Sequence, residues 1–570
     1  MKFWEKWRAS LIAGFVFLSV TVVLFGIYNA RTLKGNIDNH ILSSEMFGMP
    51  DDIRARGMTP LYGPKESGWD GQFYFYMSND ILGVKDTPKH IDAPSYRYQR
   101  IGMSLYAAIV AKLTGRDWVS PTTFFVSYLM LILAATVAGA RLLQRHGAHP
   151  GLVLFWSLGL GTQLTLLNAL PDAAADAFLI LALYLTFTNR VGWSAIPFAF
   201  AALSREVYAV FPSAILGFGM LTAMWGAGGG VKQVIERLVA RRYALLLVPG
   251  LIAVAWNIYV TQHFGASPSS QAHGILGLPL AAWAQSLNLA MHPAATGGAL
   301  RIGGFEFFSL ILFLLVLVAT LRIAAHTIRL PDSLQRPVVH GVAATAALFA
   351  VLYACFGPTV TGHYTGYFKA AAVFFYLIPL MIAVTGATGL LKRALYLLLL
   401  VSILHTMSGY LNHRIFSMPG NLNKYTRMSS VTESGRVECF GTYDAKVKVN
   451  SITLIKTTPW GALFGGGDQM VVNVALTNTG RFPFVSSTGF GSVFMSYHWN
   501  DAKGATVIDG IRSALPAPVL PGQTANVDLV TPVPTQGGLK FRPSPVQEGC
   551  AWFYQANPQI GTELPVSLEN

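Results

Sequence analysis

Residues 11–27 read Leu11-Ile12-Ala13-Gly14-Phe15-Val16-Phe17-Leu18-Ser19-Val20-Thr21-Val22-Val23-Leu24-Phe25-Gly26-Ile27. This stretch indicates that the chain folds in a lipid bilayer. It carries no charged residue, and further apolar blocks follow along the chain. A helix that crosses a bilayer needs about 20 apolar residues. The hydrophobic share of 52% and the mean hydropathy of +0.45 agree with many such crossings. The sequence therefore predicts a polytopic α-helical membrane protein.

The later blocks set the expected number of crossings. We expect them at 119–140, 151–168, 173–188, 193–204, 206–225, 243–261, 305–325, 338–356, 367–387 and 391–409. With the uncleaved first block, this predicts about eleven transmembrane helices. The pair 193–204 and 206–225 is the least regular, because its first member is short and Arg205-Glu206 interrupts it.

Basic residues predict the orientation of these helices. If the blocks alternate, the basic loops fall on the side of the N-terminus, including Arg141, Arg145, Arg190, Lys232, Arg237, Arg241, Arg242, Arg322, Arg329, Arg336, Lys392 and Arg393. Cytoplasmic loops of membrane proteins are enriched in Lys and Arg. We therefore expect a cytoplasmic N-terminus and an exterior C-terminus. We attribute the net charge of +14 to these cytoplasmic loops, so we expect no nucleic-acid partner.

A long exterior loop is expected at 30–118, and it holds Gly68-Trp69-Asp70-Gly71-Gln72-Phe73-Tyr74-Phe75-Tyr76. A carboxylate beside glycines and aromatics can act as a base next to a stacked sugar ring. We take Asp70 as the candidate catalytic group and Trp69, Gln72 and Tyr74 as candidate cavity residues. The alternative is a solvated Asp in an aromatic loop at the membrane surface.

The same loop ends in a helical pattern from Tyr96 to Thr114, more interfacial than transmembrane. It begins with Arg97 and Arg100, which are candidates for binding a phosphate.

Other ionisable residues are expected at the same outer rim. Because charges at membrane depth usually face a wet cavity, we expect these residues to line a polar cavity with the first loop: Asp172, Asp176, Arg205, Glu206, His363, Tyr364 and Lys369. His363 and Lys369 are further candidates for phosphate binding. Each has a plainer alternative: helix capping for Asp172, an internal ion pair for Arg205-Glu206, and interfacial loop residues for the last three. His413 and Arg414 share that ambiguity.

The C-terminal part changes to short alternating segments with Gly and Pro between them. We expect strands at 446–455, 469–478, 491–499, 524–532 and 550–555, which suggests an all-β sandwich. Three cysteines exclude a disulfide scaffold and offer no metal-ligand spacing. Cys439 and Cys550 flank the tail, and outside the cytoplasm a disulfide between them is preferred over a reduced pair. The expected domains are 1–415 and 416–570.

The Trp69-Asp70-Gly71 motif, the segment Tyr96-Arg97-Tyr98-Gln99-Arg100-Ile101-Gly102 and the outer rim together resemble the GT-C glycosyltransferases. The likeness covers roughly residues 1–410. The tail resembles an Ig-like accessory domain of bacterial polysaccharide-assembly proteins, through 496–499, 509–512, 515–516, 521–522, 546–549 and 551–553.

The resemblance implies an inverting glycosyltransferase in the bacterial inner membrane, with a polyprenyl-phosphate sugar donor and a glycan or glycolipid acceptor. Asp70 would be the base, with Asp38 as the alternative nearer the first span. A divalent cation such as Mg or Mn stays open, because no Asp-x-Asp pair occurs in the first loop. Two alternatives remain: a lipid-linked oligosaccharide ligase or polymerase with an acceptor groove along 262–304, and a transporter or flippase of an envelope precursor.

Overall fold

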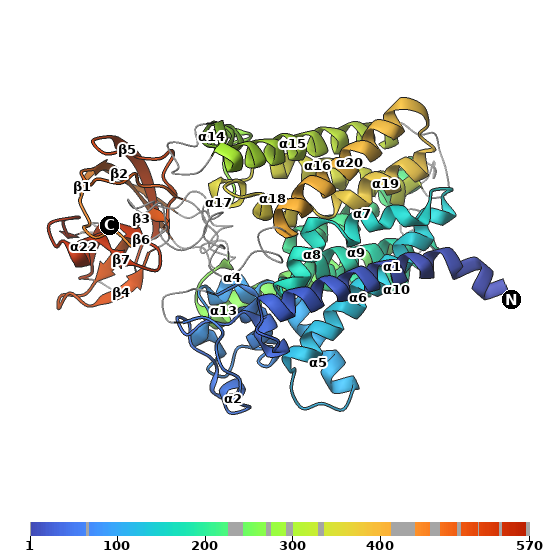
Figure 1. Ribbon diagram of the computed structural model, residues 1–570, viewed down its shortest axis with the longest axis horizontal. Helices are drawn as coiled ribbons and strands as arrows, with labels where there is room; N and C mark the ends of the chain where they lie inside the picture. Colours follow the sequence, from blue (N-terminus) through green and yellow to red (C-terminus); the bar gives the residue numbers. More distant parts are fainter. Residues whose placement is uncertain are drawn as a thin grey trace.

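The chain has a largely helical part followed by a region of β-sheet (Figure 1). The computed structural model describes residues 2–63, 68–225, 243–268, 275–291, 300–328, 336–411, 439–456, 468–486, 492–510, 512–534 and 538–565. Among the described residues, the last helix before the β region ends at Tyr410, and the first strand begins at Ala445. The expected boundary between residues 415 and 416 lies outside the described residues.

Two groups of elements make up the helical part. The first group, up to the α8–α9 turn, comprises α1 (Lys2–Arg31), η1 (Ile37–Ile41), α2 (Asp51–Arg54), α3 (Gly71–Ser78), η2 (Thr87–His90), α4 (Pro94–Tyr98), α5 (Gly102–Leu113), α6 (Pro121–Arg145), η3 (Pro150–Val153), α7 (Leu154–Ser157) and α8 (Leu160–Leu167). The second comprises α9 (Asp172–Phe187), α10 (Val191–Ser204), η4 (Glu206–Ala209), α11 (Val210–Trp225), η5 (Tyr243–Leu246), α13 (Leu247–Phe264), α14 (Ala281–Met291), α15 (Leu300–Ile328), α16 (Arg336–Ala354), α17 (Pro358–Thr361), α18 (Tyr364–Ala370), α19 (Phe374–Thr385) and α20 (Gly389–Tyr410).

All of the apolar blocks that we expected to cross are helical, but fewer are long enough to span. Six helices among the described residues pass by length and composition, and the number rises to eight if two bent pairs each count as one span. The bends are 53° between η3–α7 and α8, and 42° between α18 and α19. The chain is therefore a multi-pass membrane protein with six to eight candidate spans.

The difference from eleven arises at α9, α10 and α11. The 16 residues of α9 and the 14 of α10 reach about 24 Å and 21 Å at 1.5 Å per residue. Both lengths fall short of the roughly 30 Å of hydrocarbon in a bilayer. Most side chains of α9 are also buried by neighbouring helices, so its apolar character serves packing as well as solvation by lipid.

Contacts between helices define two ends of the bundle. At one end, the Trp7 ring lies 5.7 Å from the Arg141 guanidinium carbon and 6.1 Å from the Tyr184 ring. At the other end, the Phe25 and Phe125 rings stack at 4.1 Å. The N-terminal residues therefore share one end with the basic end of α6, as expected from charge. The β region lies at the opposite end from the N-terminus (Figure 1).

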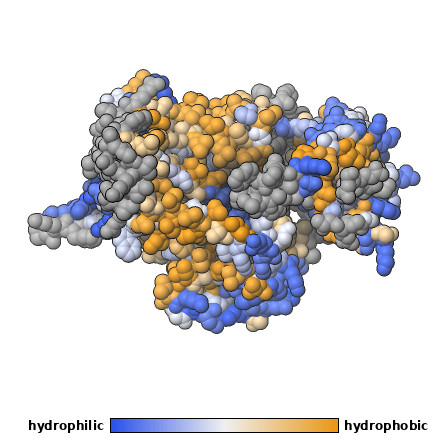
Figure 2. Space-filling view, turned by 180° about the vertical axis from the view of Figure 1, so that it is seen from behind, coloured by the Kyte–Doolittle hydropathy of each residue, from blue (hydrophilic) through white to orange (hydrophobic). Residues whose placement is uncertain are grey.

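The surface of the helical part is suited to lipid. Apolar residues cover much of it, and hydrophilic residues gather around the β region and part of the first loop (Figure 2). Among the spans, only 17% of the most apolar window of α13 and 22% of that of α20 are buried, against 72% for α6. We infer that α13 and α20 face lipid and that α6 belongs to the core of the bundle.

The first loop differs from expectation in one place. The helix expected from Tyr96 to Thr114 is split into α4 and α5, with a turn at residues 99–101. Arg97 and Arg100 therefore lie on and just after α4, while α5 carries the apolar half of the pattern.

In the described part of the β region, eight strands form two antiparallel sheets. The strands are β1 (Ala445–Ile455), β2 (Gln469–Asn478), β3 (Val493–Asn500), β4 (Thr506–Asp509), β5 (Thr524–Pro532), β6 (Lys540–Gln547), β7 (Ala551–Trp552) and β8 (Leu564–Pro565). One sheet has the order β1-β2-β5, and the other has the order β4-β3-β6-β7, with β8 also on β6. Both sheets contribute to one apolar core, in which Val472 and Leu529 from the first lie with Met495 and Trp499 from the second. The short helix α22 (Phe553–Ala556) follows β7, where we expected the strand to continue to residue 555.

The sequence did not predict β6, because Pro543 and Pro545 lie inside it. A proline cannot donate a backbone hydrogen bond and is rare in central strands. On the side of β6 away from β3, β8 pairs with residues 540–541 and β7 with residues 546–547. Residues 542–545 pair with no described strand on that side, which leaves room for both prolines.

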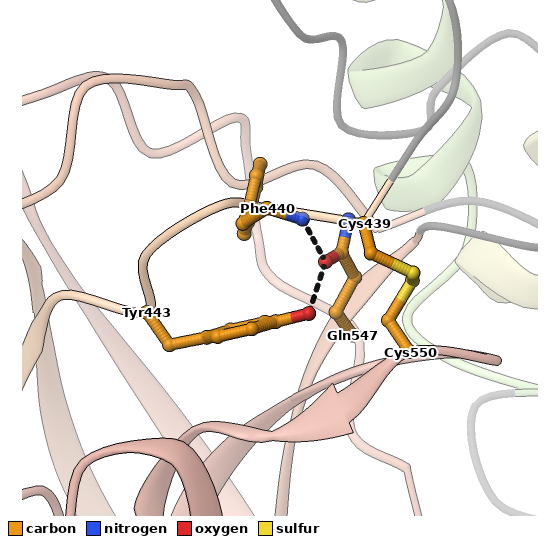
Figure 3. The surroundings of a disulfide bond; sticks show 5 residues. All are labelled: Cys439, Phe440, Tyr443, Gln547 and Cys550. Atoms are coloured by element: carbon orange, nitrogen blue, oxygen red, sulfur yellow. Dashed lines mark hydrogen bonds between the residues drawn. A yellow bond between two sulfur atoms is a disulfide. The ribbon is translucent and has the colours of Figure 1, made fainter.

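The disulfide between Cys439 and Cys550 confirms our preferred pairing (Figure 3). Their Cα atoms lie 5.4 Å apart across a sequence separation of 111 residues. Next to the disulfide, the buried Gln547 side chain accepts hydrogen bonds from the Phe440 N–H at 2.9 Å and from the Tyr443 hydroxyl at 3.2 Å. The disulfide and Gln547 together tie the start of the β region to the β6–β7 turn.

We predict that Cys439→Ser or Cys550→Ser will destabilise the β region by about 2–5 kcal/mol, because a long loop is released in the unfolded chain. Limited proteolysis of the full chain in detergent should show faster cleavage after residue 439. The matched control is Cys355→Ser, which removes the free thiol and should leave the cleavage rate unchanged. Equal rates for all three variants would contradict a stabilising role.

Candidate functional site

A close approach of two backbone turns places Asp70. Asp70 precedes α3, and a Cβ on the following Gly71 would lie 2.1 Å from the Asn168 carbonyl oxygen. Only glycine allows the turn before α3 to pack so closely on the turn between α8 and α9. The first loop is also tied to α8 by the His40 Nε2, which donates to the Leu166 carbonyl at 3.0 Å. The motif of the first loop thus lies at the start of α9.

The Arg97 guanidinium is shared between two carboxylates. Its Nη1 donates to Asp70 Oδ2 at 2.9 Å. Its Nε and Nη2 donate to the two oxygens of Asp92 at 2.9 Å and 2.7 Å. Arg97 is buried, whereas 47% of the Asp70 side chain is exposed. A bidentate pair restricts a guanidinium more than a single hydrogen bond does, so Asp92 orients Arg97 and Arg97 orients Asp70.

Asp70 keeps its charge in this setting. Loss of water around the carboxyl raises its pKa, but the nearby charges of Arg97, Lys369 and Arg100, together with the hydrogen bond from Arg97, outweigh that effect and lower the pKa below its usual value. Asp70 Oδ1 accepts no hydrogen bond from any residue that the structure describes. The site therefore presents an ionised carboxylate with one oxygen held and the other open.

A second arginine joins the first loop to η4. Arg100 donates from Nε and Nη2 to the two oxygens of Glu206, at 3.2 Å and 3.1 Å. This approach also depends on a glycine, because a Cβ on Gly102 would lie 2.3 Å from Ser204 Oγ and 2.6 Å from the Phe200 carbonyl oxygen. The start of α5 therefore packs directly on the end of α10.

Arg205 and Asp172 form a third pair, at 3.4 Å between Nη1 and Oδ1. The same Nη1 donates to the Ala370 carbonyl at the end of α18, at 2.7 Å. Asp172 is not the N-cap residue, because Pro171 occupies that position, but it lies in the first turn of α9, where the helix dipole favours its charge. Arg205 and Glu206 each bind a partner from another segment, so the internal pair that we considered is not what holds this turn.

Asp176 lies one turn deeper in α9 and is 2% exposed. Trp156 Nε1 donates to its Oδ2 at 3.0 Å, and the Tyr208 hydroxyl donates to its Oδ1. A carboxylate buried this deeply requires such donors. Asp176 therefore joins α7, α9 and η4 beneath the exposed charges.

The aromatic row of the motif is buried. Gln72 is 0% and Tyr74 is 1% exposed, and Phe73, Phe75 and Tyr76 are buried with them. Gln72 Oε1 accepts the backbone N–H of Ser44 at 3.0 Å, and burial raises the pKa of Tyr74 to about 12. In this conformation these side chains fill the core beneath Asp70, and Trp69, which is partly exposed, packs against the same core.

Lys369 and His363 have different surroundings, although both lie near α18. The charge of Lys369 acts on Asp70, and Lys369 forms no ion pair within 4 Å with a described residue. The His363 ring caps α18 by accepting the Thr365 N–H, and its Nε2 lies 3.6 Å from Glu306 Oε1. Tyr364 is buried and packs edge-on against Phe305. His363 and Tyr364 thus anchor the start of the helix that carries Lys369.

Sequence patterns missed several residues of this network. Asp92 contacts a predicted site residue of its own segment, and Trp156, Tyr208 and Glu306 contact predicted site residues of other segments. Asp92 could have been suspected as an acid five residues before Arg97, but the other three required the tertiary contacts. Asp38, the alternative base, lies in η1, where its N–H bonds to the Asn36 side chain. His413 and Arg414 lie outside the described residues.

A small hollow lies behind the site, where the two bent helix pairs meet. It is lined mainly by apolar residues of α7, α8, α18, α19 and α20, with Trp156 in its wall, and the centre of a water-sized sphere can move within only about 10 Å³ of it. A cavity needs roughly 10–15 Å³ of such space to hold one water molecule. The hollow is therefore about the size of one water site, and Asp70 does not line it, so we do not assign it to a substrate.

Comparisons with known proteins identify no family for this chain. No protein-family model matches the chain, and no curated protein sequence matches it significantly. Within the described ranges, no three His, Cys, Asp or Glu side chains are grouped as metal ligands would be. The chemistry of the site therefore rests on its paired charges: an ionised, accessible carboxylate beside a lysine, supported by three arginine–carboxylate pairs.

We predict that Gly71→Ala will destabilise the protein by about 1–3 kcal/mol, because the added methyl group overpacks the contact with Asn168. Thermal unfolding in detergent, followed by circular dichroism, measures the effect. Gly250→Ala is the matched control, since a Cβ there meets no heavy atom within 4 Å. Equal melting temperatures for the two variants would argue against the close approach.

We predict that Arg97→Gln will raise the pKa of Asp70, because Arg97 is the strongest charge that offsets its loss of water. A lowered carboxyl pKa stabilises the fold above the unfolded pKa of about 4 and loses that effect as the pH falls through the folded value. Unfolding of wild type and Arg97→Gln should therefore differ most at neutral pH and converge in acid. Arg56→Gln, which breaks an exposed pair, should show a small difference throughout. A constant gap for Arg97→Gln would refute the coupling.

Proposed function

We propose that this protein is an inverting membrane glycosyltransferase of the GT-C type. It transfers a sugar from a polyprenyl-phosphate donor to a glycan or glycolipid of the cell envelope, at the outer face of the bacterial inner membrane. In this proposal α9, α10 and α11 complete about eleven crossings, the N-terminus is cytoplasmic, and the two sheets form a periplasmic β-sandwich of the Ig-like kind.

The observation that carries the proposal is the state of Asp70. One of its oxygens is held by Arg97 at 2.9 Å, while 47% of the side chain is exposed. A general base must be ionised, oriented and able to reach a hydroxyl proton. Asp70 meets the first two conditions, and its open Oδ1 supports the third.

The proposed step displaces the lipid phosphate from the sugar. Asp70 Oδ1 removes the proton of an acceptor hydroxyl as that oxygen attacks the anomeric carbon. The bond from the anomeric carbon to the phosphate oxygen breaks, and its electron pair leaves with the lipid phosphate. Attack opposite the leaving group inverts the configuration. Stabilisation of the departing phosphate contributes at least as much as the base.

We assign the departing phosphate to Lys369 and assign Arg97 and Arg100 to positioning. Both arginines, which the sequence suggested as phosphate ligands, form bidentate pairs with carboxylates. A phosphate would have to break those pairs, whereas the Lys369 ammonium forms no ion pair within the part of the chain that the structure describes. Because the carboxylates around Asp70 are bound to arginines, we derive no step through a divalent cation.

Asp70→Asn tests the base. The variant should bind the donor normally yet turn over about 10²- to 10⁴-fold more slowly. Mass analysis of products from a panel of polyprenyl-phosphate sugars measures turnover, and donor binding is measured separately. Asp38→Asn is the matched control and should keep its activity. Normal glycan product from Asp70→Asn would show that Asp70 is not the base. If the same variant still exported an envelope precursor at the wild-type rate, a transporter would be favoured over an enzyme.

Lys369→Gln tests the phosphate site and should affect binding instead. Loss of a charge-assisted hydrogen bond of about 1.5–3 kcal/mol weakens binding roughly 10- to 100-fold. The matched control is Lys392→Gln, because Lys392 lies at the start of α20, on a different helix from Lys369. Unchanged donor affinity in Lys369→Gln would contradict the assignment.

A further inference from the structure

Two apolar side chains project from the first loop into the surroundings. Leu82 is 50% and Val84 is 67% exposed. Their neighbours Ile81 and Gly83 pack inward, so the segment presents Leu82 and Val84 together on its outer side. We call residues 81–84 the apolar tip.

The apolar tip is held rigidly from behind. The buried Asp80 carboxylate accepts the N–H of Val84 at 3.1 Å and that of Lys85 at 3.0 Å. The Gly83 N–H donates to the Asp80 carbonyl at 3.1 Å. The Tyr98 hydroxyl donates to the same carbonyl at 2.9 Å. Exposure of the two side chains is therefore built into the loop and does not come from a loose conformation.

Helix α13 holds the other side of the apolar tip. The Tyr259 hydroxyl donates to the Leu82 carbonyl at 2.7 Å, and His263 Nε2 donates to the Gly83 carbonyl at 2.9 Å. Gly83 has a positive φ of 65°, and a Cβ there would lie 2.8 Å from the Phe264 ring. The apolar tip is thus fixed at the level of residues 259–264 of α13.

That level is where the exposed face of α13 changes from apolar to polar. Leu247, Leu251, Val254 and Ile258 form an exposed row at helical spacing, and the next exposed position on that side, Gln262, is polar. Trp256 and Tyr259 stack at 5.1 Å just before this change. Trp and Tyr are enriched where a membrane meets water. The end of the apolar row therefore marks the boundary of the bilayer on α13.

We propose that the apolar tip is a membrane anchor, in which Leu82 and Val84 insert among the lipids at the head-group boundary beside α13. The apolar tip contacts α13 through Tyr259 and His263, directly after the exposed apolar row that ends at Ile258. The same loop carries Asp92 and Arg97, so the anchor sets the height of these two residues, and of Asp70 bound to Arg97, relative to the bilayer. The proposal does not depend on the reaction that the site performs.

Spin labels test this placement in the full chain. Leu82→Cys, Val84→Cys and Lys89→Cys are each made in a Cys355→Ser background, labelled with a nitroxide and reconstituted into phosphatidylcholine vesicles. Lys89 is an exposed residue of the same loop, and Ile258→Cys serves as the lipid-facing reference. Collision with oxygen, which concentrates in lipid, is compared with collision with a water-soluble nickel chelate.

Labels at residues 82 and 84 should resemble the label at 258, with more collisions with oxygen than with nickel, and the label at 89 should show the reverse. Nickel accessibility at 82 and 84 equal to that at 89 would place the apolar tip in water and overturn the proposal. Protection from both reagents would also overturn it, because a protein segment would then cover the tip.

Discussion

The arrangement of this protein depends on the requirement that charges at the end of a membrane bundle be paired. Arg97 lies between Asp70 and Asp92, Arg100 binds Glu206, and Arg205 binds Asp172. Each arginine and its carboxylate come from different segments except for Arg97 and Asp92, so the pairs also join the first loop to α9, α10 and η4. A buried guanidinium without a carboxylate would be strongly unfavourable, which makes these pairs conditions of the fold.

The same ion pairs distinguish the residues that orient the site from those that can contact a substrate. Arg97 and Arg100 are engaged by carboxylates, whereas Asp70 keeps one open oxygen and Lys369 lies within electrostatic reach of it. The open oxygen of Asp70 and the Lys369 ammonium, which forms no ion pair with a described residue, are the groups that we propose for base catalysis beside a departing phosphate. Asp176, with its two buried donors, braces the helices beneath.

The helices that carry the site are short or broken. Helices α9 and α10 are too short to cross a bilayer as ideal rods, and α7–α8 and α18–α19 are bent. Charged residues at the ends of such segments reach the interior of the bundle without lying in lipid. The long helices α13 and α20, by contrast, remain mostly exposed and meet the lipid. Long helices therefore provide the boundary with the membrane, and short ones place the charges.

The sequence alone determined the solvent, the helical blocks, most of the strands and the disulfide partners. Composition, apolar run length and strand alternation are local properties, and β2 begins and ends where its pattern predicts. Asp70 could likewise be selected from its glycine and aromatic setting. The tertiary structure decided which charges meet. No local pattern shows that Asp92 orients Arg97, that Gly71 packs on Asn168, or that Tyr74 is buried. Those facts depend on contacts between distant segments. Strand β6 was missed for the same reason, because its prolines pair with β3 on one side and are tolerated where no described strand pairs with them on the other side.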